Sequence, residues 1–356
     1  MHSISLCMIV KNEEANLERC LKSAAGYVDE MIIVDTGSTD RTKEIACRYT
    51  DRVYDFIWED DFSTARNYSI SQASNEHILV LDADEQLQSM DRDEVERLNH
   101  ICPEGIGRIL IVSQYTRNNY TYKQRERVSR LFSKELYQYE GRIHEQLVPL
   151  YKREAAQTVS ITYDVPIVVE HLGYEGDLTA RRSKTQRNIK LLKAAQEQDP
   201  EDPYLLYQLG KSFYMEEDYH SACEYFGHAL YFDLDPRLEY VQDMVESYGY
   251  TLINTGQYET ALQMLNIYDE FSHSADFLFL TGLILMNNGK FEEAIIELEK
   301  AAEKPCSKVD GVNGYLAFYN IGVIYECLGN NENAVRYYKK CREYRPALRK
   351  LMDMIE

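Results

Sequence analysis

The chain has 356 residues, of which 44% are apolar and 28% charged, and this composition is that of a folded protein of two or three domains. Its formal net charge of −20 argues against a nucleic-acid partner and against adhesion to an anionic membrane surface. Wholesale disorder, a collagen-like fold and a disulfide-stapled mini-protein are excluded by the composition.

The eight cysteines are scattered along the chain and form no CxxC pair. This pattern argues against a structural zinc site and indicates reduced thiols in a cytosolic protein. The N-terminal segment MHSISLCMIVKNEE has too short an apolar core for a signal peptide, and no stretch approaches 18 apolar residues. We therefore expect a cytoplasmic protein without a membrane-spanning helix.

Short apolar runs alternate with helical patterns at the start of the chain. Strands are predicted at 4–10, 31–34, 52–57 and 78–81, and helices at 14–25, 42–49 and 65–73. Such alternation is typical of βαβ units and a mostly parallel sheet. In open sheets of this kind ligands bind beyond the carboxyl ends of the strands, where the segments KNEE, DTGSTD and DADE lie.

The second half repeats a pattern of small residues. Each of four glycines is followed twelve positions later by an alanine, and the glycines are Gly210, Gly249, Gly282 and Gly322. The unit of about 34 residues, with short insertions, resembles tetratricopeptide repeats, in which stacked helical hairpins form an array. Gly and Ala are expected where two helices cross closely. The second unit is the weakest, and Asn331 departs from the aromatic residue that the others carry nine positions after the glycine.

Asp82 and Asp84 follow the apolar run HILVL. Strand alternation would turn both side chains to the same side, and two carboxylates together suit a divalent cation. Such an ion can neutralise a diphosphate and ease its departure. The alternative is that the two aspartates only cap a turn or a helix.

Asp35 ends the second predicted strand in VDTGSTD, where Gly37 permits a tight turn and Ser38 or Asp40 can cap the next helix. A carboxylate at this position can accept hydrogen bonds from a nucleoside base or ribose. Capping alone is the alternative for Asp35, and it is the preferred interpretation for Asp40.

The segments MIVKNEE, IIVDTGSTDRT, DDFSTARN and LVLDADE resemble, in order and spacing, family 2 glycosyltransferases with a GT-A fold. Residues 128–192 resemble the continuation in a bacterial subgroup that ends in tetratricopeptide repeats. That subgroup includes lipopolysaccharide-core glucosyltransferases and transferases that S-glycosylate bacteriocin peptides. We expect a Rossmann-like GT-A α/β domain at 1–175, a linking helix at 176–200 and an all-α domain of about four tetratricopeptide repeats at 201–356.

The resemblance implies roles for single residues. The positions where the family grips the uridine and the donor correspond here to Val10, Asn12, Glu13, Asp35 and Arg66. Asp82 and Asp84 match the metal-binding acidic pair, with Asp84 as the more direct ligand. His171 in VEHLGY stands where GT-A enzymes often supply a late metal ligand, although a structural role is the alternative for a histidine at a strand end.

An inverting transferase needs a carboxylate or an imidazole that takes the proton of the acceptor. The ED pair that many family members use is not intact in this chain. We favour Glu145 in GRIHEQL as the base, with His144 lining the acceptor or donor pocket. The alternative is that Glu145 pairs with an arginine such as Arg130 or Arg142.

Basic residues gather in this acidic chain at Arg117, Lys123, Arg125, Arg127 and Arg130. They are candidates to cover the diphosphate or to meet an acidic acceptor. A solvated loop is the preferred interpretation for Lys123 and Arg125, whereas the RLF segment at Arg130 matches the subgroup.

Further along, Lys184 and Arg187 precede the repeats in the linking helix. These two side chains could reach a phosphate of the donor. Salt bridges near a hinge between the two modules are an equal alternative.

Taken together, the sequence predicts a metal-dependent, inverting glycosyltransferase that uses Mn²⁺ or Mg²⁺ and a UDP-hexose or UDP-N-acetylhexosamine. The predicted acceptor is a Ser, Thr or Cys side chain of a peptide recruited through the repeats, whose acidic groove favours a basic or neutral peptide. A lipopolysaccharide or other envelope glycan as acceptor, and a non-catalytic nucleotide-binding scaffold, stay open as alternatives. The repeats also leave a homodimer open. The chain lacks the QxxRW signature of processive synthases.

Overall fold

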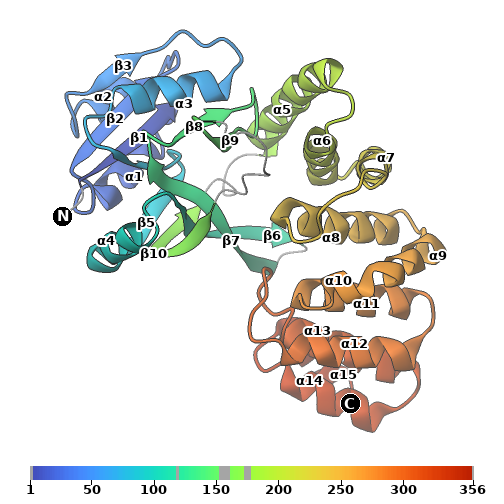
Figure 1. Ribbon diagram of the computed structural model, residues 1–356. Helices are drawn as coiled ribbons and strands as arrows, with labels where there is room; N and C mark the ends of the chain where they lie inside the picture. The colour runs from blue at the N-terminus through green and yellow to red at the C-terminus, as the bar shows by residue number, and fades with distance from the viewer. Residues whose placement is uncertain (1–2, 118–119, 152–160, 172–177, 355–356) are drawn as a thin grey trace. The chain divides into compact units, whose positions relative to one another are not determined.

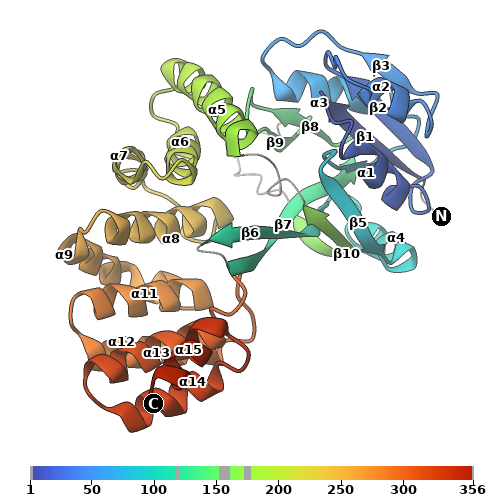
Figure 2. The same ribbon diagram turned by 180° about the vertical axis from the view of Figure 1, so that it is seen from behind.

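The computed structural model describes residues 3–117, 120–151, 161–171 and 178–354. The chain divides into two compact units, Met1–Arg181 and Arg182–Glu356. Figures 1 and 2 show a sheet with flanking helices in the first unit and helices alone in the second.

The first unit is built on an eight-stranded sheet, as far as the described residues go, with the strand order β3-β2-β1-β4-β7-β6-β10-β5. Parallel pairing joins β3, β2, β1 and β4, and also β6 with β10, whereas β7 is antiparallel to both of its neighbours. The strands are β1 (Ile4–Val10), β2 (Glu30–Asp35), β3 (Val53–Asp55), β4 (His77–Val80), β5 (Glu85–Met90), β6 (Ile106–Arg117), β7 (Tyr120–Ser133) and β10 (Thr162–His171).

Helices cover both faces of this sheet because the central strands are apolar on both sides. In β1, Leu6 and Met8 join the core that also contains Leu17 and Leu21 of α1, whereas Cys7 joins the core on the opposite face. The first face carries α1 (Leu17–Ala24), α2 (Thr42–Ala46) and α4 (Arg92–Ile101), and the second carries α3 (Phe62–Ser71) with the ribbon of β8 (Tyr137–Glu140) and β9 (Gln146–Pro149).

The second unit consists of stacked helical hairpins. The helix α5 (Leu178–Gln198) begins four residues before the boundary between the units and continues into the second unit. The hairpins that follow are α6 (Pro203–Met215) with α7 (Tyr219–Ala229), α8 (Glu239–Asn254) with α9 (Tyr258–Ala261), η1 (Leu262–Ile267) and α10 (Tyr268–Phe271), α11 (Ala275–Asn287) with α12 (Phe291–Glu303), and α13 (Tyr315–Cys327) with α14 (Asn331–Lys340), before α15 (Arg345–Asp353).

The repeated glycines stand where the helices of a hairpin cross closely, as the sequence predicts. A Cβ atom on Gly210 would come within 2.6 Å of the Phe226 ring, and one on Gly282 within 2.6 Å of Leu298. In the weak second unit, Gly249 faces Leu280 of the next hairpin instead. The second helix of that unit is interrupted by the 3₁₀ segment η1, so it does not supply the usual partner for the glycine.

Two helices of the first unit begin at other residues than the periodicity predicts. The helix α3 begins at Phe62 rather than at Ala65 because Asp61 caps it by accepting a hydrogen bond of 3.0 Å from the backbone N–H of Thr64. The helix α1 begins at Leu17 rather than at Glu14. The preceding KNEE segment is held by the loop after β2 and contains Asn12 at φ 56°, outside the helical region.

The eight cysteines of the described chain are all free thiols. Burial raises the pKa of the Cys7 and Cys20 thiols well above their usual range, so these two are poor nucleophiles. Among the helices that the structure describes, none combines the length and the apolar character that crossing a membrane requires.

Candidate active site

The carboxyl ends of three neighbouring parallel strands bring the acidic motifs to one edge of the sheet. Asp35 of β2 lies opposite Val10 of β1, and Cys7 of β1 lies opposite Val80 of β4. The segment with the two motif aspartates follows directly after Val80, the last residue of β4. Because β2 and β4 flank β1, Asp35 and this segment follow the carboxyl ends of strands at the same edge of the sheet.

The loops after β1 and β2 are joined by hydrogen bonds. The backbone N–H of Asn12 donates to Oγ of Ser38 at 2.9 Å, and Oδ1 of Asn12 accepts from the backbone N–H of Thr39 at 2.8 Å. The backbone N–H of Glu13 donates to Oγ1 of Thr42 at 2.7 Å. Asn12 and Glu13, predicted as nucleotide contacts, therefore also fix the two loops to each other.

Asp35 is 2% exposed at the end of β2. Its Oδ2 accepts hydrogen bonds from the backbone N–H groups of Gly37 at 3.1 Å and Ser38 at 2.9 Å, and Gly37 has the positive φ of 101° that this tight turn requires. In the described structure its Oδ1 is buried without a partner. A buried acceptor without a partner costs about 1–3 kcal/mol, so this atom suits a donor group of a ligand. Asp40 accepts hydrogen bonds from the backbone N–H of Thr42, the first residue of α2, at 3.0 Å and from the backbone N–H of Glu14 at 3.1 Å.

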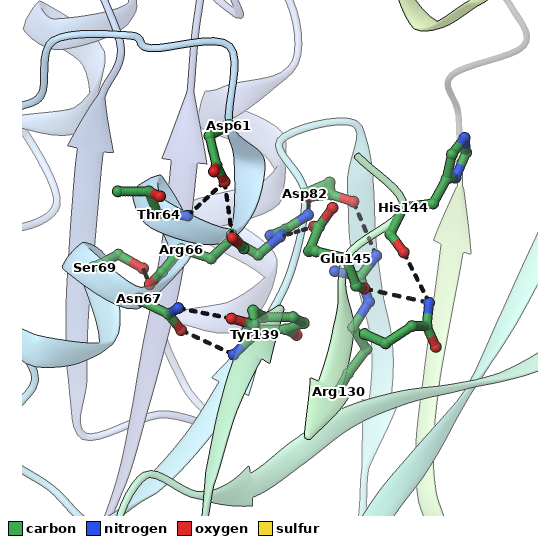
Figure 3. A network of polar contacts seen from close by, with 12 residues as sticks. Asp61, Thr64, Arg66, Asn67, Ser69, Asp82, Arg130, Tyr139, His144 and Glu145 are labelled. Atoms are coloured by element: carbon green, nitrogen blue, oxygen red, sulfur yellow. Dashed lines mark hydrogen bonds and ion pairs between the residues drawn. The ribbon is translucent and has the colours of Figure 1, made fainter. Parts of the chain in front are cut away.

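Asp82 is bound by two arginines, the buried Arg66 and the partly buried Arg130. Nη2 of Arg66 lies 2.9 Å from Oδ1 of Asp82, and Nη2 of Arg130 lies 2.9 Å from its Oδ2 (Figure 3). Burial opposes the charge of this carboxylate, but Arg130 and Arg66 together hold the pKa of Asp82 well below its usual range. Both oxygens of Asp82 are thus engaged by guanidinium groups, which differs from the metal-ligand role predicted for it.

The expected side-by-side pair of Asp82 and Asp84 does not form. The strand β4 ends at Val80, and the motif lies in a turn in which the backbone N–H of Glu85 donates to the carbonyl of Asp82. The alternation of a strand no longer applies there, so Asp82 contacts the arginines of α3 and β7 whereas Asp84 contacts β10. The expected strand alternation is therefore wrong at this motif, whereas the binding of one cation by both aspartates stays a prediction.

Glu85 is a further buried acidic residue that the sequence reasoning missed. Its Oε2 accepts from the backbone N–H of Asp82 at 2.8 Å, and its Oε1 lies 3.4 Å from Nη2 of Arg130. Burial raises the pKa of Glu85 to about 6, against the lowering effect of Arg130. The signal was present in the sequence, because Glu85 is the third acidic residue of DADE.

Glu145 reaches the same group of charges from the turn before β9. Its Oε1 accepts a hydrogen bond from Nε of Arg66, so the arginine that pairs with Glu145 is Arg66 and not Arg130 or Arg142. Arg66, predicted to approach the base or the donor, therefore joins Asp82 to Glu145 (Figure 3). In the part of the chain that is described, Nη1 of Arg66 and Nε of Arg130 are buried donors without a partner.

His144 precedes Glu145 but its imidazole points away from Arg66 and Asp82 (Figure 3). Its backbone has a positive φ of 52°, which is uncommon for a residue other than glycine. Burial lowers the pKa of His144, so the imidazole is neutral at pH 7. Its Nε2 is buried without a partner among the described residues.

Asp84 and His171 meet across the pairing of β5 with β10. His171 lies opposite Glu85 in this antiparallel pair, and its Nε2 is 3.3 Å from Oδ2 of Asp84. On the other side of the ring, Nδ1 lies 3.3 Å from Oγ of Ser113, which orients the imidazole. A carboxylate and an imidazole that meet in this way form a candidate ligand pair.

The Asp84–His171 pair fits a divalent cation by its chemistry and spacing. Neighbouring ligands in an octahedral shell with bonds of about 2.1 Å lie about 3 Å apart, close to the separation of these two atoms. Within the described residues no group of three or more His, Cys, Asp or Glu side chains is arranged to hold a metal ion. A cation here would therefore need other ligands in addition to the two protein groups.

The predicted basic cluster is spread along β7. Lys123 and Arg125 are exposed on this strand rather than on a loop. Arg127 donates to the carbonyl of Val165 at 3.1 Å, a structural contact, so Arg130 is the member of this set that reaches the acidic residues of the site. Two predicted residues, Arg117 and Lys184, have side chains that lie outside the described part of the chain, and Arg187 of α5 bonds to its neighbour Asn188 at 3.4 Å.

Comparison with known protein families agrees with this arrangement. Residues 5–156 match the family model "Glycosyl transferase family 2", and residues 249–309 and 315–348 match two tetratricopeptide-repeat models. The chain combines a family 2 glycosyl transferase domain with tetratricopeptide repeats. The site described above thus lies within the family 2 domain, with His171 beyond the matched residues.

Three curated bacterial proteins are similar to this chain. A TPR repeat-containing protein of Synechococcus elongatus is 35% identical, over 62% of this chain and 55% of its own length. The prophage-derived glycosyltransferase SunS of Bacillus subtilis is 28% identical, over 63% and 52% respectively. The lipopolysaccharide core biosynthesis glycosyltransferase LpsC of Rhizobium meliloti is 29% identical, over 47% and 65%. The match with the first two relatives spans about half of their length.

Among solved structures, the repeat protein YrrB is similar at 23% identity, over 49% of this chain and 86% of that chain, with a TM-score of 0.41. YrrB is described as a TPR protein with an unusual peptide-binding site. At this level of identity the likeness concerns the helical fold alone.

Proposed function

We propose that the family 2 domain transfers a hexose or an N-acetylhexosamine from a UDP-sugar to a Ser, Thr or Cys side chain of a polypeptide, with inversion at the sugar. The observation that carries the proposal is the meeting of Asp84 with His171, next to the arginine-bound Asp82, at the carboxyl edge of the parallel strands. The relatives that are named glycosyltransferases support this class of reaction.

The proposed donor lies across the ends of β2, β1 and β4. The partnerless Oδ1 of Asp35 suits an N–H or O–H group of the uridine. Beside Asp82, the partnerless Nη1 of Arg66 and Nε of Arg130 offer donors to oxygens of the sugar or the diphosphate. The two ends of this edge thus have complementary hydrogen-bonding character, as a nucleotide-sugar requires.

Asp84 and His171 are the residues that would hold a divalent cation, Mn²⁺ or Mg²⁺. Such a cation would neutralise the charge that develops on the leaving diphosphate. Oxygens of that diphosphate could supply further ligands, which fits a site with only two protein donors. Ser113 would keep the His171 imidazole in place through its contact with Nδ1.

In the proposed reaction, the oxygen or sulfur of the acceptor attacks the anomeric carbon from the side opposite to the diphosphate. The new bond forms as the bond between carbon and the diphosphate oxygen breaks, and UDP leaves with the electron pair. We assign the acceptor proton to the carboxylate of Glu145, which Arg66 holds in position. His144, neutral and with a partnerless Nε2, is the rival proton acceptor.

The acceptor is proposed to be a polypeptide, for which the repeats offer an extended binding surface. The repeat half carries more acidic than basic residues, so it suits a neutral or basic peptide better than an anionic glycan. The similarity to LpsC favours a second candidate, in which the same chemistry acts on a lipopolysaccharide core.

The decisive experiment measures release of UDP or GDP from a panel of nucleotide-sugars, with Mn²⁺, with Mg²⁺ and with EDTA. We expect slow, metal-dependent hydrolysis of one UDP-sugar, which is lost in Asp84→Ala. Asp93→Ala, an exposed aspartate in the first turn of α4, is the matched control and should retain activity. Donor binding without release, in the presence of peptide and glycan acceptors, would instead favour a scaffold.

A further inference from the structure

An acidic and aromatic segment stands beside the proposed active site. It comprises residues 55–62, with the sequence DFIWEDDF, and connects the end of β3 to the start of α3; we call it the rim segment. Ile57 is 85% exposed, and Trp58, the one tryptophan in the chain, is partly exposed. Four of the eight side chains are carboxylates, so apolar surface and negative charge occur together here.

The rim segment is fixed by its own contacts. The indole of Trp58 packs edge-on against the Phe62 ring, with 4.8 Å between the ring centroids, and its Nε1 donates to Oδ1 of Asp60 at 2.9 Å. Asp61 caps α3 through the backbone N–H of Thr64. A surface that is ordered before binding loses little conformational entropy when a partner docks.

Two contacts connect the rim segment to the site. The backbone N–H of Phe62 donates to the carbonyl of Arg142 at 2.8 Å, three residues before Glu145. Arg66, which bonds to Glu145, follows Phe62 by one helical turn, about 6 Å along α3. Figure 3 shows Asp61 at the beginning of the helix whose Arg66 approaches Asp82 and Glu145. A chain that presents a side chain to Glu145 therefore passes close to the rim segment.

The charge of the rim segment is only partly balanced by its described neighbours. Asp55 forms a salt bridge of 2.6 Å with Lys43. Asp60 and Asp61 accept hydrogen bonds from neutral groups of Trp58, Ser63 and Thr64, which leaves their negative charges in place. Glu59 is exposed.

We propose that the rim segment binds a Lys or Arg side chain of the acceptor polypeptide, two to four residues from the side chain that receives the sugar. Glu59, Asp60 and Asp61 supply the negative charge, while Ile57 and the Trp58 ring contact the aliphatic stem and the cationic group. The separation of two to four residues follows from two lengths. Phe62 and Arg66 are one helical turn apart, and an extended acceptor chain rises about 3.4 Å per residue. This inference rests on the proposed function and narrows its substrate to basic polypeptides.

The charge also argues against two other occupants of this surface. A lipopolysaccharide core carries anionic groups, and the cytoplasmic face of a membrane is negatively charged, so both would meet repulsion from Glu59, Asp60 and Asp61. An apolar partner alone would not need three carboxylates around Ile57 and Trp58. A cationic peptide fits both the carboxylates and the exposed apolar side chains of the rim segment.

The test uses the full chain, its preferred UDP-sugar and a peptide library. Each peptide has a central Ser, Thr or Cys, and one flanking position at a time carries Lys, Ala or Glu. We expect a Lys placed two to four residues from the centre, on one side of it, to lower KM about fivefold relative to Ala at the same position. A Glu at that position should raise KM. Transfer rates that are indifferent to charge at every position would overturn the inference.

Charge reversal on the protein gives a result that a folding defect cannot imitate. We expect Glu59→Lys to invert the preference, so that the Glu peptide is used better than the Lys peptide. Glu135→Lys is the matched control, because Glu135 is exposed and lies near the amino end of β4, where the backbone N–H of Lys134 donates to the carbonyl of Glu76. An unchanged preference in Glu59→Lys contradicts the inference, as does an inverted one in Glu135→Lys.

Failure of the inference is distinguishable from failure of the proposed function. If no peptide accepts sugar from any UDP-sugar while a lipopolysaccharide core does, the polypeptide acceptor itself is wrong, and the basic-peptide inference with it. If peptides are modified without regard to Lys, the proposed function stands and the inference alone is wrong.

Discussion

Nη2 of Arg66 lies 2.9 Å from Oδ1 of Asp82, and Nε of the same guanidinium bonds to Glu145. One side chain of α3 thus joins two carboxylates that lie 16 and 79 positions away from it in sequence. Burial opposes its charge, but Asp82 and Glu145 raise the pKa of Arg66 above its usual range, so it remains cationic. The acidic residues of the site are arranged around a cation that belongs to the protein.

Arg66→Ala should destabilise the first unit by about 3 kcal/mol, because the largely buried Glu145 and the partly exposed Asp82 both lose the buried guanidinium that they share. Arg66→Lys keeps the charge but loses the fork that reaches both carboxylates, so it should recover part of the stability and little of the turnover. Urea unfolding and UDP release measure the two effects.

The control for this pair of variants is Arg97→Ala, which breaks an exposed salt bridge to Glu94 and should cost less than about 1 kcal/mol. Equal losses of stability in Arg66→Ala and Arg97→Ala would show that the buried network contributes nothing special.

The Asp84–His171 pair predicts a shared dependence on metal. In the presence of UDP, Mn²⁺ should raise the melting temperature of the protein, since binding to the folded state stabilises it. Asp84→Asn and His171→Ala should each remove most of this shift while the melting temperature without metal changes little. A full Mn²⁺ shift in both variants would place the cation elsewhere.

Much of this site is visible in the sequence, but its connections are not. The strand–helix rhythm and the motifs DTGSTD and DADE indicate which loops meet at the edge of a sheet. Which side chains become partners is harder to predict from the sequence. Arg66 meets Glu145, and Asp84 meets His171, because segments far apart in the chain pack together. The turn at DADE also overrode the alternation expected of a strand, which is why the two aspartates separate.

The repeats show the same contrast between local and distant information. The phased glycines predicted close helix crossings, which Gly210 and Gly282 confirm. The 3₁₀ interruption at Leu262–Ile267 was not predicted, because the sequence of the second unit keeps its Gly and Ala positions. With the second helix interrupted, Gly249 packs against Leu280 of the following hairpin.

Gly210→Ala should destabilise the repeat domain by about 1–2 kcal/mol. The added methyl group would lie 2.6 Å from the buried Phe226 ring, and overpacking exceeds the gain in helix propensity. Gly227→Ala in the neighbouring helix α7 is the control. Its Cβ would meet nothing closer than 3.8 Å, so we expect a stabilisation of about 0.5–1 kcal/mol. Thermal unfolding should show a lower melting temperature for Gly210→Ala and a higher one for Gly227→Ala than for the wild-type protein.

Glu246 predicts a pH dependence of repeat stability. It is buried in α8, its carboxylate lies 3.0 Å from Nζ of Lys308, and burial raises its pKa to about 7 from 4.5 despite that lysine. The folded state therefore holds the proton more tightly than the unfolded chain. The cost of ionisation is absent below about pH 4.5, grows as pH rises, and reaches about 3 kcal/mol above pH 7.

The variant Glu246→Gln isolates this contribution because it keeps the size of the side chain and cannot ionise. Between pH 5 and 8 its free energy of unfolding should fall less steeply with pH than that of the wild-type protein. Urea titrations at each pH give the free energy of unfolding of both proteins. If this free energy changes with pH equally in the two, Glu246 is not the titrating group.

The pairing of β5 with β10 has a consequence for how the first unit is assembled during synthesis. Asp84 meets His171 only when β10, the last strand of the sheet, has taken its place between β6 and β5. A nascent chain that has left the ribosome up to Glu145 already holds Asp35, Asp82, Arg66 and Arg130, but it lacks His171. The proposed cation pair is therefore assembled late in translation, after the rest of the active site has been synthesised.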